Sequence, residues 1–237
     1  MVRLGALLRD RQGAQGLAQR AYQQLRGDIT RCSLAPGARI TQAELVEEYG
    51  FSQAAIREAL TRLNQDGLVE VIPREGYVIS QMTLKQAQDL YETRLLVECE
   101  VARLAAARCP EAHLNQLTEI QENLTHWDDN IDQMVMTNSA FHIAVAEATG
   151  NERLLAMITG LHDELSRHLY LFYQIAQGQR MPPEIGYAHE RLIEALETGD
   201  GEAAARATHV EIEFVRDTVL SALRESPSLL SVNLVPQ

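Results

Sequence analysis

The chain has 237 residues and a hydrophobic content of 46%, which is ordinary for a globular protein of one or two domains. No run approaches the roughly 20 consecutive apolar residues of a membrane-spanning helix, so a membrane protein is not expected. The three cysteines (Cys32, Cys99 and Cys109) are odd in number and lack a CxxC spacing. They argue against a disulfide framework or a thiolate metal site and favour a reducing, cytoplasmic location.

The net charge of −12 is unevenly distributed along the chain. Residues 1–80 carry 10 Arg or Lys and 9 Asp or Glu, a net of +1, whereas the remaining 157 residues carry 11 and 24, a net of −13. The acidic part would be repelled by nucleic-acid phosphates, and the nearly neutral part attracts them only weakly. If the chain binds DNA, its affinity must therefore depend on a few specific contacts and on dimerisation.

The N-terminal segment, residues 1–16, has a basic residue and a short, interrupted apolar patch. It lacks the small-residue cleavage site of a signal peptide, so we expect a mobile leader. The residues that follow, Leu17–Arg31, predict an amphipathic helix because apolar side chains recur at helical spacing on one face.

The segment Ile40–Asn64, with the sequence ITQAELVEEYGFSQAAIREALTRLN, predicts two short helices joined by a tight turn. Thr41 and Glu44 form a capping box at the start of the first helix, and Gly50 is suited to end that helix in the left-handed conformation. Ser52 caps the second helix, whose outer face is polar and carries an arginine. This pattern is typical of a helix-turn-helix that enters a DNA major groove.

Two strand-like runs, residues 67–72 and 77–79, flank a turn at Pro73–Gly76 and predict a β-hairpin. A helix, a helix-turn-helix and a hairpin in this order predict a winged helix. The segments LRGDIT, LAPGARIT and LVEEYGFSQAAIREALTRLNQDGLVEVIPREGYVI resemble the DNA-binding domain of the GntR regulators. The resemblance implies that residues 17–80 form a DNA-binding domain.

The second helix of the motif is expected to read the operator. Arg57 would contact phosphate or guanine, Gln53 would read adenine through its amide, and Arg74 would reach the minor groove from the wing. Two hydroxyl groups would hold phosphates. Relatives commonly carry arginines where this chain has Ala43 and Gln53, so its base preference is expected to differ from theirs. The residues expected to contact DNA are Ser52, Gln53, Arg57, Thr61 and Arg74.

A second domain is expected to begin after Gln81–Met82, where Thr83 and Gln86 form another capping box. Helical periodicity without any further β-pattern predicts an all-α bundle, so the fold class is mostly α. The expected helices cover residues 83–109, 111–127, 131–149, 152–177, 184–198 and 201–225. We expect this domain to span residues 83–225 and to be followed by a tail, residues 226–237.

Three segments of the second domain are YETRLLVECEVARLAAAR, NSAFHIAVAEATGNERL and AHERLIEALETGDGEAAARA. They resemble the FCD ligand-binding domain of the FadR-like branch of the GntR regulators. In that family an Asp or Asn, a His four residues on and two later His hold a divalent metal inside the bundle. Asn138, His142 and His189 match the first three positions, and the spacing of Asn138 and His142 places both on one helix face.

The fourth position departs from the family pattern, because an ungapped alignment places Glu211 where relatives have a histidine. His209 is the alternative, but it lies two residues away, about 200° around a helix, so both cannot face one ion. We favour Glu211, since a carboxylate also binds Zn²⁺. A set of nitrogen and oxygen ligands without sulfur suits a divalent metal, with Zn²⁺ favoured and Ni²⁺ or Mn²⁺ as alternatives.

The resemblance also implies an arginine that faces the cavity, here Arg94, whose planar fork suits a carboxylate. Arg94 and the metal would grip a small organic acid from two sides, with Asn151 as a neighbour of the cavity. The alternative is that Arg94 and Glu98 form a surface pair at i,i+4 spacing and that Asn151 is only a turn residue. His162 and His168 are interpreted as solvated or intrahelical.

These features predict a DNA-binding transcriptional regulator rather than an enzyme. It would act as a cytoplasmic homodimer on a double-stranded DNA operator and respond to a small organic-acid effector bound with the metal. Release of the operator on effector binding, as in a repressor, is expected, and activation is the alternative. Other interpretations are a metal-dependent enzyme fused to a helix-turn-helix, a metal-free acyl-CoA-type sensor, and a co-regulator whose DNA-binding domain has decayed.

Overall fold

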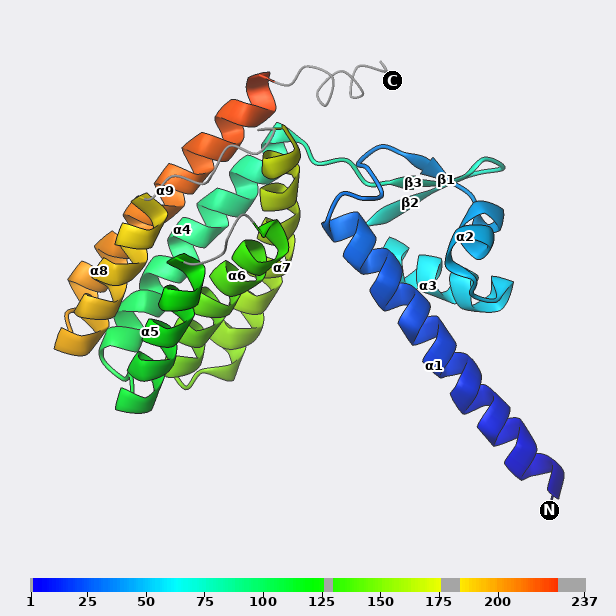
Figure 1. Ribbon diagram of the computed structural model, residues 1–237, viewed down its shortest axis with the longest axis horizontal. Coiled ribbons are helices and arrows are strands. Elements are labelled where there is room, and N and C mark those ends of the chain that lie inside the picture. Colours follow the sequence, from blue (N-terminus) through cyan, green and yellow to red (C-terminus); the bar gives the residue numbers. More distant parts are fainter. Residues whose placement is uncertain (1, 126–129, 176–183, 226–237) are drawn as a thin grey trace. The chain divides into compact units, whose positions relative to one another are not determined.

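The computed structural model describes residues 2–125, 130–175 and 184–225, so the expected tail at 226–237 lies outside the described residues. The chain divides into two compact units, Met1–Met82 and Thr83–Gln237. Helices dominate, and the described residues contain a single small sheet, which lies in the first unit. The expectation of a mostly α protein with an N-terminal winged helix and a C-terminal helical bundle is confirmed (Figure 1).

The first unit is a winged helix. Its three strands form an antiparallel sheet in the order β1-β3-β2, and its apolar residues form one core between the helices and the sheet. Its elements are α1 (Val2–Thr30), β1 (Arg39–Ile40), α2 (Gln42–Tyr49), α3 (Gln53–Gln65), β2 (Val69–Ile72) and β3 (Gly76–Ile79).

Helix α1 differs from the expectation, because it begins at Val2 rather than at Leu17. Leu, Ala, Arg and Gln, all good helix formers, are frequent in residues 2–16, and no proline interrupts them. The helix therefore includes the segment expected to be a leader. Its buried face is the one predicted, since Leu25 and Ile29 are fully enclosed by the core of the unit.

The capping interactions and helix ends predicted for the helix-turn-helix are present in the structure. The Thr41 hydroxyl accepts a hydrogen bond from the Glu44 backbone N–H at 3.3 Å, and the Glu44 carboxylate accepts one from the Thr41 N–H at 2.8 Å. Gly50 ends α2 with a φ of 68°, and the Ser52 hydroxyl accepts from the Ala55 N–H at 3.3 Å to cap α3. These caps set the short turn that holds α3 against α2.

The strand β1 was not predicted from the sequence. It is only two residues long and pairs with β3, Ile40 lying opposite Tyr77. The neighbouring Gly76 has a φ of 110°, and a Cβ added there would lie 2.7 Å from the carbonyl oxygen of Ile40. Glycine is thus required where β1 approaches the base of the wing.

The second unit is an all-α bundle. Helix α4 packs against α6, α7, α8 and α9, and Thr83 caps it through the predicted capping box with Gln86. The expected helix ends at 127 and 177 lie outside the described residues. Among the described helices, none combines the length and the apolar character needed to cross a membrane. The helices are α4 (Leu84–Ala106), α5 (Glu111–Thr125), α6 (Ile131–Ala148), α7 (Glu152–Ile175), α8 (Glu184–Thr198) and α9 (Gly201–Glu225).

Candidate functional site

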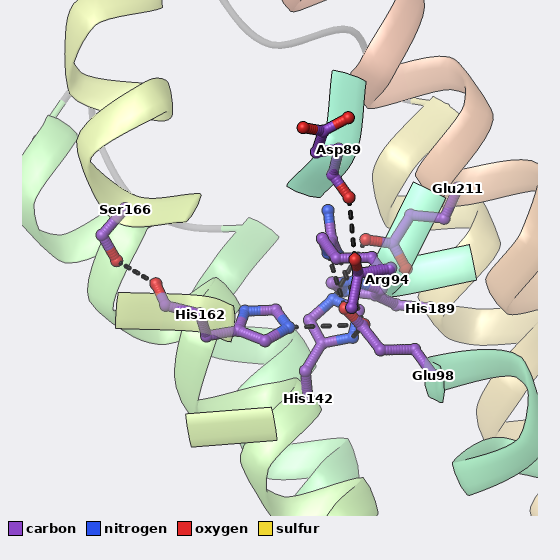
Figure 2. A network of polar contacts seen from close by, with 9 residues as sticks. Asp89, Arg94, Glu98, His142, His162, Ser166, His189 and Glu211 are labelled. Carbon is purple, nitrogen blue, oxygen red and sulfur yellow. Dashed lines mark hydrogen bonds and ion pairs between the residues drawn. The ribbon is translucent and has the colours of Figure 1, made fainter. Parts of the chain in front are cut away.

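A cluster of charged and imidazole side chains lies inside the otherwise apolar bundle (Figure 2). Three helices that are distant in the sequence contribute His142 (α6), His189 (α8) and Glu211 (α9), all buried. The Nε2 atom of His142 lies 3.0 Å from Oε1 of Glu211, and Nε2 of His189 lies 3.4 Å from Oε2 of the same carboxylate. Both imidazoles therefore approach one carboxylate, each at a different oxygen.

Helix α4 supplies a second carboxylate to the cluster. Glu98 Oε2 lies 3.1 Å from Nδ1 of His142 and 3.3 Å from Nε2 of His162 on α7. Arg94, one turn earlier on α4, donates to both Glu98 oxygens, from Nε at 2.5 Å and from Nη2 at 3.2 Å. Figure 2 shows Glu98 with His142, His162 and Arg94 around it. Glu98 thus joins the guanidinium to both rings.

The electrostatics of the cluster separate its three histidines. Burial alone would lower the pKa of His142, but the carboxylates of Glu211 and Glu98 raise it to about 9. Burial lowers the pKa of His162 to about 4 and also lowers that of His189. The pKa of Glu211 is lowered against the effect of burial, because His142 and His189 stabilise its charged form. At neutral pH the cluster therefore contains one imidazolium, two neutral imidazoles and two carboxylates.

The residues present fit a divalent metal. His189 Nε2 and Glu211 Oε2 are buried, have no hydrogen-bond partner among the described residues and lie 3.4 Å apart. Unpaired buried polar atoms are costly unless something binds them, and imidazole nitrogen with carboxylate oxygen is a common ligand set for Zn²⁺, Ni²⁺ and Mn²⁺. One ligand atom from each of His142, His189 and Glu211 lies within 4.8 Å of the others.

Two further residues were expected to bind metal, and one of them is buried while the other is exposed. Asn138 is buried on α6, one turn before His142. The side chain of His209 is 52% exposed and lies 3.3 Å from Glu213. Of the two alternatives for the fourth position, the structure brings Glu211 to the cluster and leaves His209 at the surface, because residues two apart on a helix face opposite sides.

The structure places the two residues expected to bind the effector, Arg94 and Asn151, in different surroundings. Arg94 pairs with Glu98, as in the alternative interpretation, but the pair is wholly buried rather than at the surface. The cavity beside Glu98 and His142 holds about 10 Å³, the space of a single water molecule, so no organic acid fits there in this conformation. Asn151 is exposed, and its side-chain oxygen accepts from the N–H groups of Arg153 and Leu154 at the start of α7. Its structural role is that of a turn and capping residue.

Sequence reasoning missed two members of the cluster. His162 was interpreted as solvated or intrahelical, but it is fully buried beside Glu98, whereas His168 is buried with an intrahelical contact to the Glu164 carbonyl. Gln121 on α5 was not considered, and its Oε1 lies 3.0 Å from Nδ1 of His189. The available signal was position, since His162 stands in an apolar series with Ile158, Leu165 and Leu169 at helical spacing.

In the first unit, the outward face of α3 carries the residues expected to read DNA. Gln53 and Arg57 are exposed, and Arg74 stands exposed at the turn between β2 and β3 with a φ of 71°. The Ser52 hydroxyl oxygen accepts the capping hydrogen bond from the Ala55 N–H, so its hydroxyl proton can still be donated to a phosphate. Thr61 donates its proton to the Arg57 carbonyl at 2.9 Å, so this bond must break before Thr61 can hold a phosphate.

Comparison with known protein families supports the assignment of a winged helix in the first unit and a helical domain of the FCD type in the second. Residues 17–79 match the model described as bacterial regulatory proteins, gntR family, and residues 89–213 match the FCD domain. The HTH-type transcriptional repressor RspR of Escherichia coli is 25% identical over 220 residues, covering 92% of this chain and 95% of that protein. The HTH-type transcriptional regulator LutR of Bacillus subtilis is 28% identical over 220 residues, covering 84% and 99%.

Solved structures show the same fold. The structure of E. coli McbR/YncC has a TM-score of 0.70 at 22% identity and covers 88% of this chain and 98% of its own. A putative GntR transcriptional regulator from Rhodococcus sp. RHA1 has a TM-score of 0.71 at 20% identity, covering 86% and 98%. The relatives are named as transcriptional regulators, not enzymes, as predicted for this chain. With a winged helix of the GntR type followed by an FCD domain, the chain belongs to the GntR family of DNA-binding transcriptional regulators.

Proposed function

We propose that this regulator is a FadR-like homodimer whose operator binding is controlled by a divalent metal and a small carboxylate effector in the second unit. The observation that carries the proposal is the buried triad of His142, His189 and Glu211, with unpaired nitrogen and oxygen atoms facing each other. Asn138, one turn from His142, is the fourth ligand in this proposal. Zn²⁺ is the favoured ion, because it accepts His and carboxylate ligands with one position open.

The charge of the loaded site supports an anionic effector. Histidines that bind metal are neutral, so the charged groups are the ion, Arg94, Glu98 and Glu211. The two charges of the ion and the one of Arg94 exceed the two carboxylates by one positive charge. A buried excess charge is costly, and a monocarboxylate bound to the open position of the metal neutralises it. The Nη1 group of Arg94 is buried, has no hydrogen-bond partner in the described part of the chain and would be the donor to this effector.

The size of the interior supports a coupled conformational change. The cavity beside Glu98 and His142, about 10 Å³, does not admit an organic acid, so an acid bound at that cavity requires the helices around it to separate. A ligand that binds only the opened bundle shifts the population towards it. In a dimer, this change would alter the spacing of the two α3 helices and hence their fit to paired half-sites.

The names of two relatives support a direction of regulation. Two of them, RspR and GlaR of E. coli, are named as transcriptional repressors, so we propose that this chain is a repressor released by its effector. Arg57 and Gln53 on the exposed face of α3 would read bases, and Arg74 on the wing would enter the minor groove. The protein would act in the cytoplasm, where its operator lies.

Metal loading and thermal shifts test the proposal. Full-length protein is stripped with a chelator, reloaded with Zn²⁺, Ni²⁺ or Mn²⁺, and analysed for bound metal before it is heated with a panel of small carboxylic acids. We expect one ion per chain and a higher melting temperature with at least one acid, because a ligand of the native state stabilises it by mass action. Operator DNA selected from a random library should then be released by that acid. Stripped protein that takes up none of the three ions would refute the proposal.

A further inference from the structure

We propose that Glu98 and Gln121 are positioning residues that determine which ring nitrogens of His142 and His189 face the metal. The inference rests on the proposed metal site. Glu98 and Gln121 come from helices α4 and α5, and both are buried. Each contacts the Nδ1 atom of one histidine, on the side of the ring opposite the triad with Glu211.

The contact to His142 is rigid because Glu98 is itself held in place. Arg94 donates to both of its oxygens, and the same Oε2 that lies 3.1 Å from His142 Nδ1 also lies 3.3 Å from His162 Nε2. A carboxylate only accepts hydrogen bonds, so before the metal binds both ring nitrogens of His142 carry protons, Nδ1 facing Glu98 and Nε2 facing Glu211. When Glu211 becomes a metal ligand, the proton on Nε2, 3.0 Å from Glu211, is the one displaced, whereas Glu98, held by Arg94, still accepts from Nδ1, so the lone pair of the neutral ring lies on Nε2.

The contact to His189 follows the same logic with a neutral acceptor. The amide of Gln121 donates from its Nε2 atom to the Gly186 carbonyl at 3.1 Å, and this bond turns its Oε1 atom towards Nδ1 of His189 at 3.0 Å. The His189 Nδ1–H therefore donates to Gln121, and the lone pair lies on Nε2. Phe141 stacks on the His189 ring, with centroids 4.0 Å apart, and keeps the ring in this plane.

These two bonds select one metal triad over another. Ligand atoms of Glu98, His142 and His162 also lie within 4.8 Å of one another, and that set shares His142 with the proposed triad. A neutral imidazole has one lone pair, so His142 serves only one of the two sets. Because Glu98 holds the proton on Nδ1, the ion binds at Nε2 with His189 and Glu211. Hydrogen bonds of this kind to metal-binding histidines are common, and their loss typically lowers metal affinity about 10–100-fold.

The test measures Zn²⁺ affinity by chelator competition on full-length, metal-free protein. Gln121→Met removes the acceptor for His189 and keeps the length of the side chain. Its matched control is Gln116→Met, at an exposed position of the same helix. We expect affinity about 10–100-fold lower for Gln121→Met and within about twofold of wild type for Gln116→Met. Melting of the metal-free forms separates this effect from a loss of folding.

Glu98→Asp makes the equivalent change at His142, because it shortens the reach of the carboxylate while leaving a negative charge for Arg94. The control is Glu92→Asp, at an exposed position of α4. We expect a loss of Zn²⁺ affinity of about 10–100-fold for Glu98→Asp only. If this variant does not fold, Gln121→Met and the spectrum described next still decide the matter.

Two-bond proton–nitrogen spectra of Zn²⁺-loaded wild type with ¹⁵N-labelled histidine report the bound nitrogens directly. For His142 and His189 we expect a proton on Nδ1 and the metal on Nε2. A metal on Nδ1 of His142, or equal Zn²⁺ affinities for Gln121→Met and Gln116→Met, would overturn the positioning roles. Wild-type protein that binds no metal would instead overturn the proposed function on which they rest.

Discussion

Metal binding at neutral pH should displace one proton, and that proton comes from His142. Its neighbours Glu211 and Glu98 raise its pKa to about 9 in the metal-free protein, whereas His162 and His189 have lowered pKa values and are already neutral. At pH 7 only about 1% of the His142 rings are neutral, so the apparent metal affinity is roughly 100-fold below its limit. It should rise about tenfold per pH unit between pH 7 and pH 9.

Calorimetry in buffers of different ionisation enthalpy counts the released protons. For Zn²⁺ added to metal-free protein at pH 7, the observed heat plotted against buffer enthalpy should give a slope of about one proton per ion. The control is Glu211→Ala, which removes both a ligand and the main carboxylate that raises the pKa of His142. Binding without proton release and with constant affinity from pH 6.5 to 8.5 would show that His142 is neutral before the metal arrives, and the reasoning would fail.

The same pKa predicts how the stability of the metal-free protein depends on pH. The folded pKa of His142, about 9, lies above its unfolded value of about 6.5, so its contribution is fully present below pH 6.5. It is lost as the pH rises through 9 and is worth at most about 3 kcal/mol. The melting temperature of the metal-free form should fall over this range. Metal-loaded protein is the control, because there His142 is already neutral and does not titrate over this range.

Three further predictions concern single side chains. Arg57→Ala should leave the melting temperature unchanged and weaken operator binding by about 2–6 kcal/mol for a dimer on two half-sites, as measured by fluorescence anisotropy, since one base contact is worth about 1–3 kcal/mol; undiminished binding would exclude the docking of α3. Glu211→Ala should abolish Zn²⁺ uptake while His209→Ala leaves it within about twofold, and the reverse result would place the ligand at His209. Leu60→Ala, at a fully buried position of α3, should destabilise the first unit by about 2–5 kcal/mol in urea unfolding, and a loss below about 1 kcal/mol would contradict the core packing.

The sequence by itself determined the winged helix and the ends of its helices. The signals are local: the capping box links Thr41 and Glu44, three positions apart, and Gly50 ends α2 through its own backbone conformation. Contacts this short along the chain form with little dependence on distant segments, so residue type and spacing predict them. The spacing of Asn138 and His142 on one helix face is of the same kind.

Only the tertiary structure decided what surrounds those faces. His142 meets Glu211 across 69 positions of the sequence, and His189 meets Gln121 across 68. The i,i+4 spacing predicts that Arg94 and Glu98 share a helix face. Whether this face is buried depends on the packing of α4 against the other helices of the bundle, α6, α7, α8 and α9. The tertiary structure also left only about 10 Å³ in the cavity beside Glu98 and His142. These contacts and the burial of this face depend on how whole helices pack together. The periodicity of one helix shows which residues share a face but does not show which helix will cover that face.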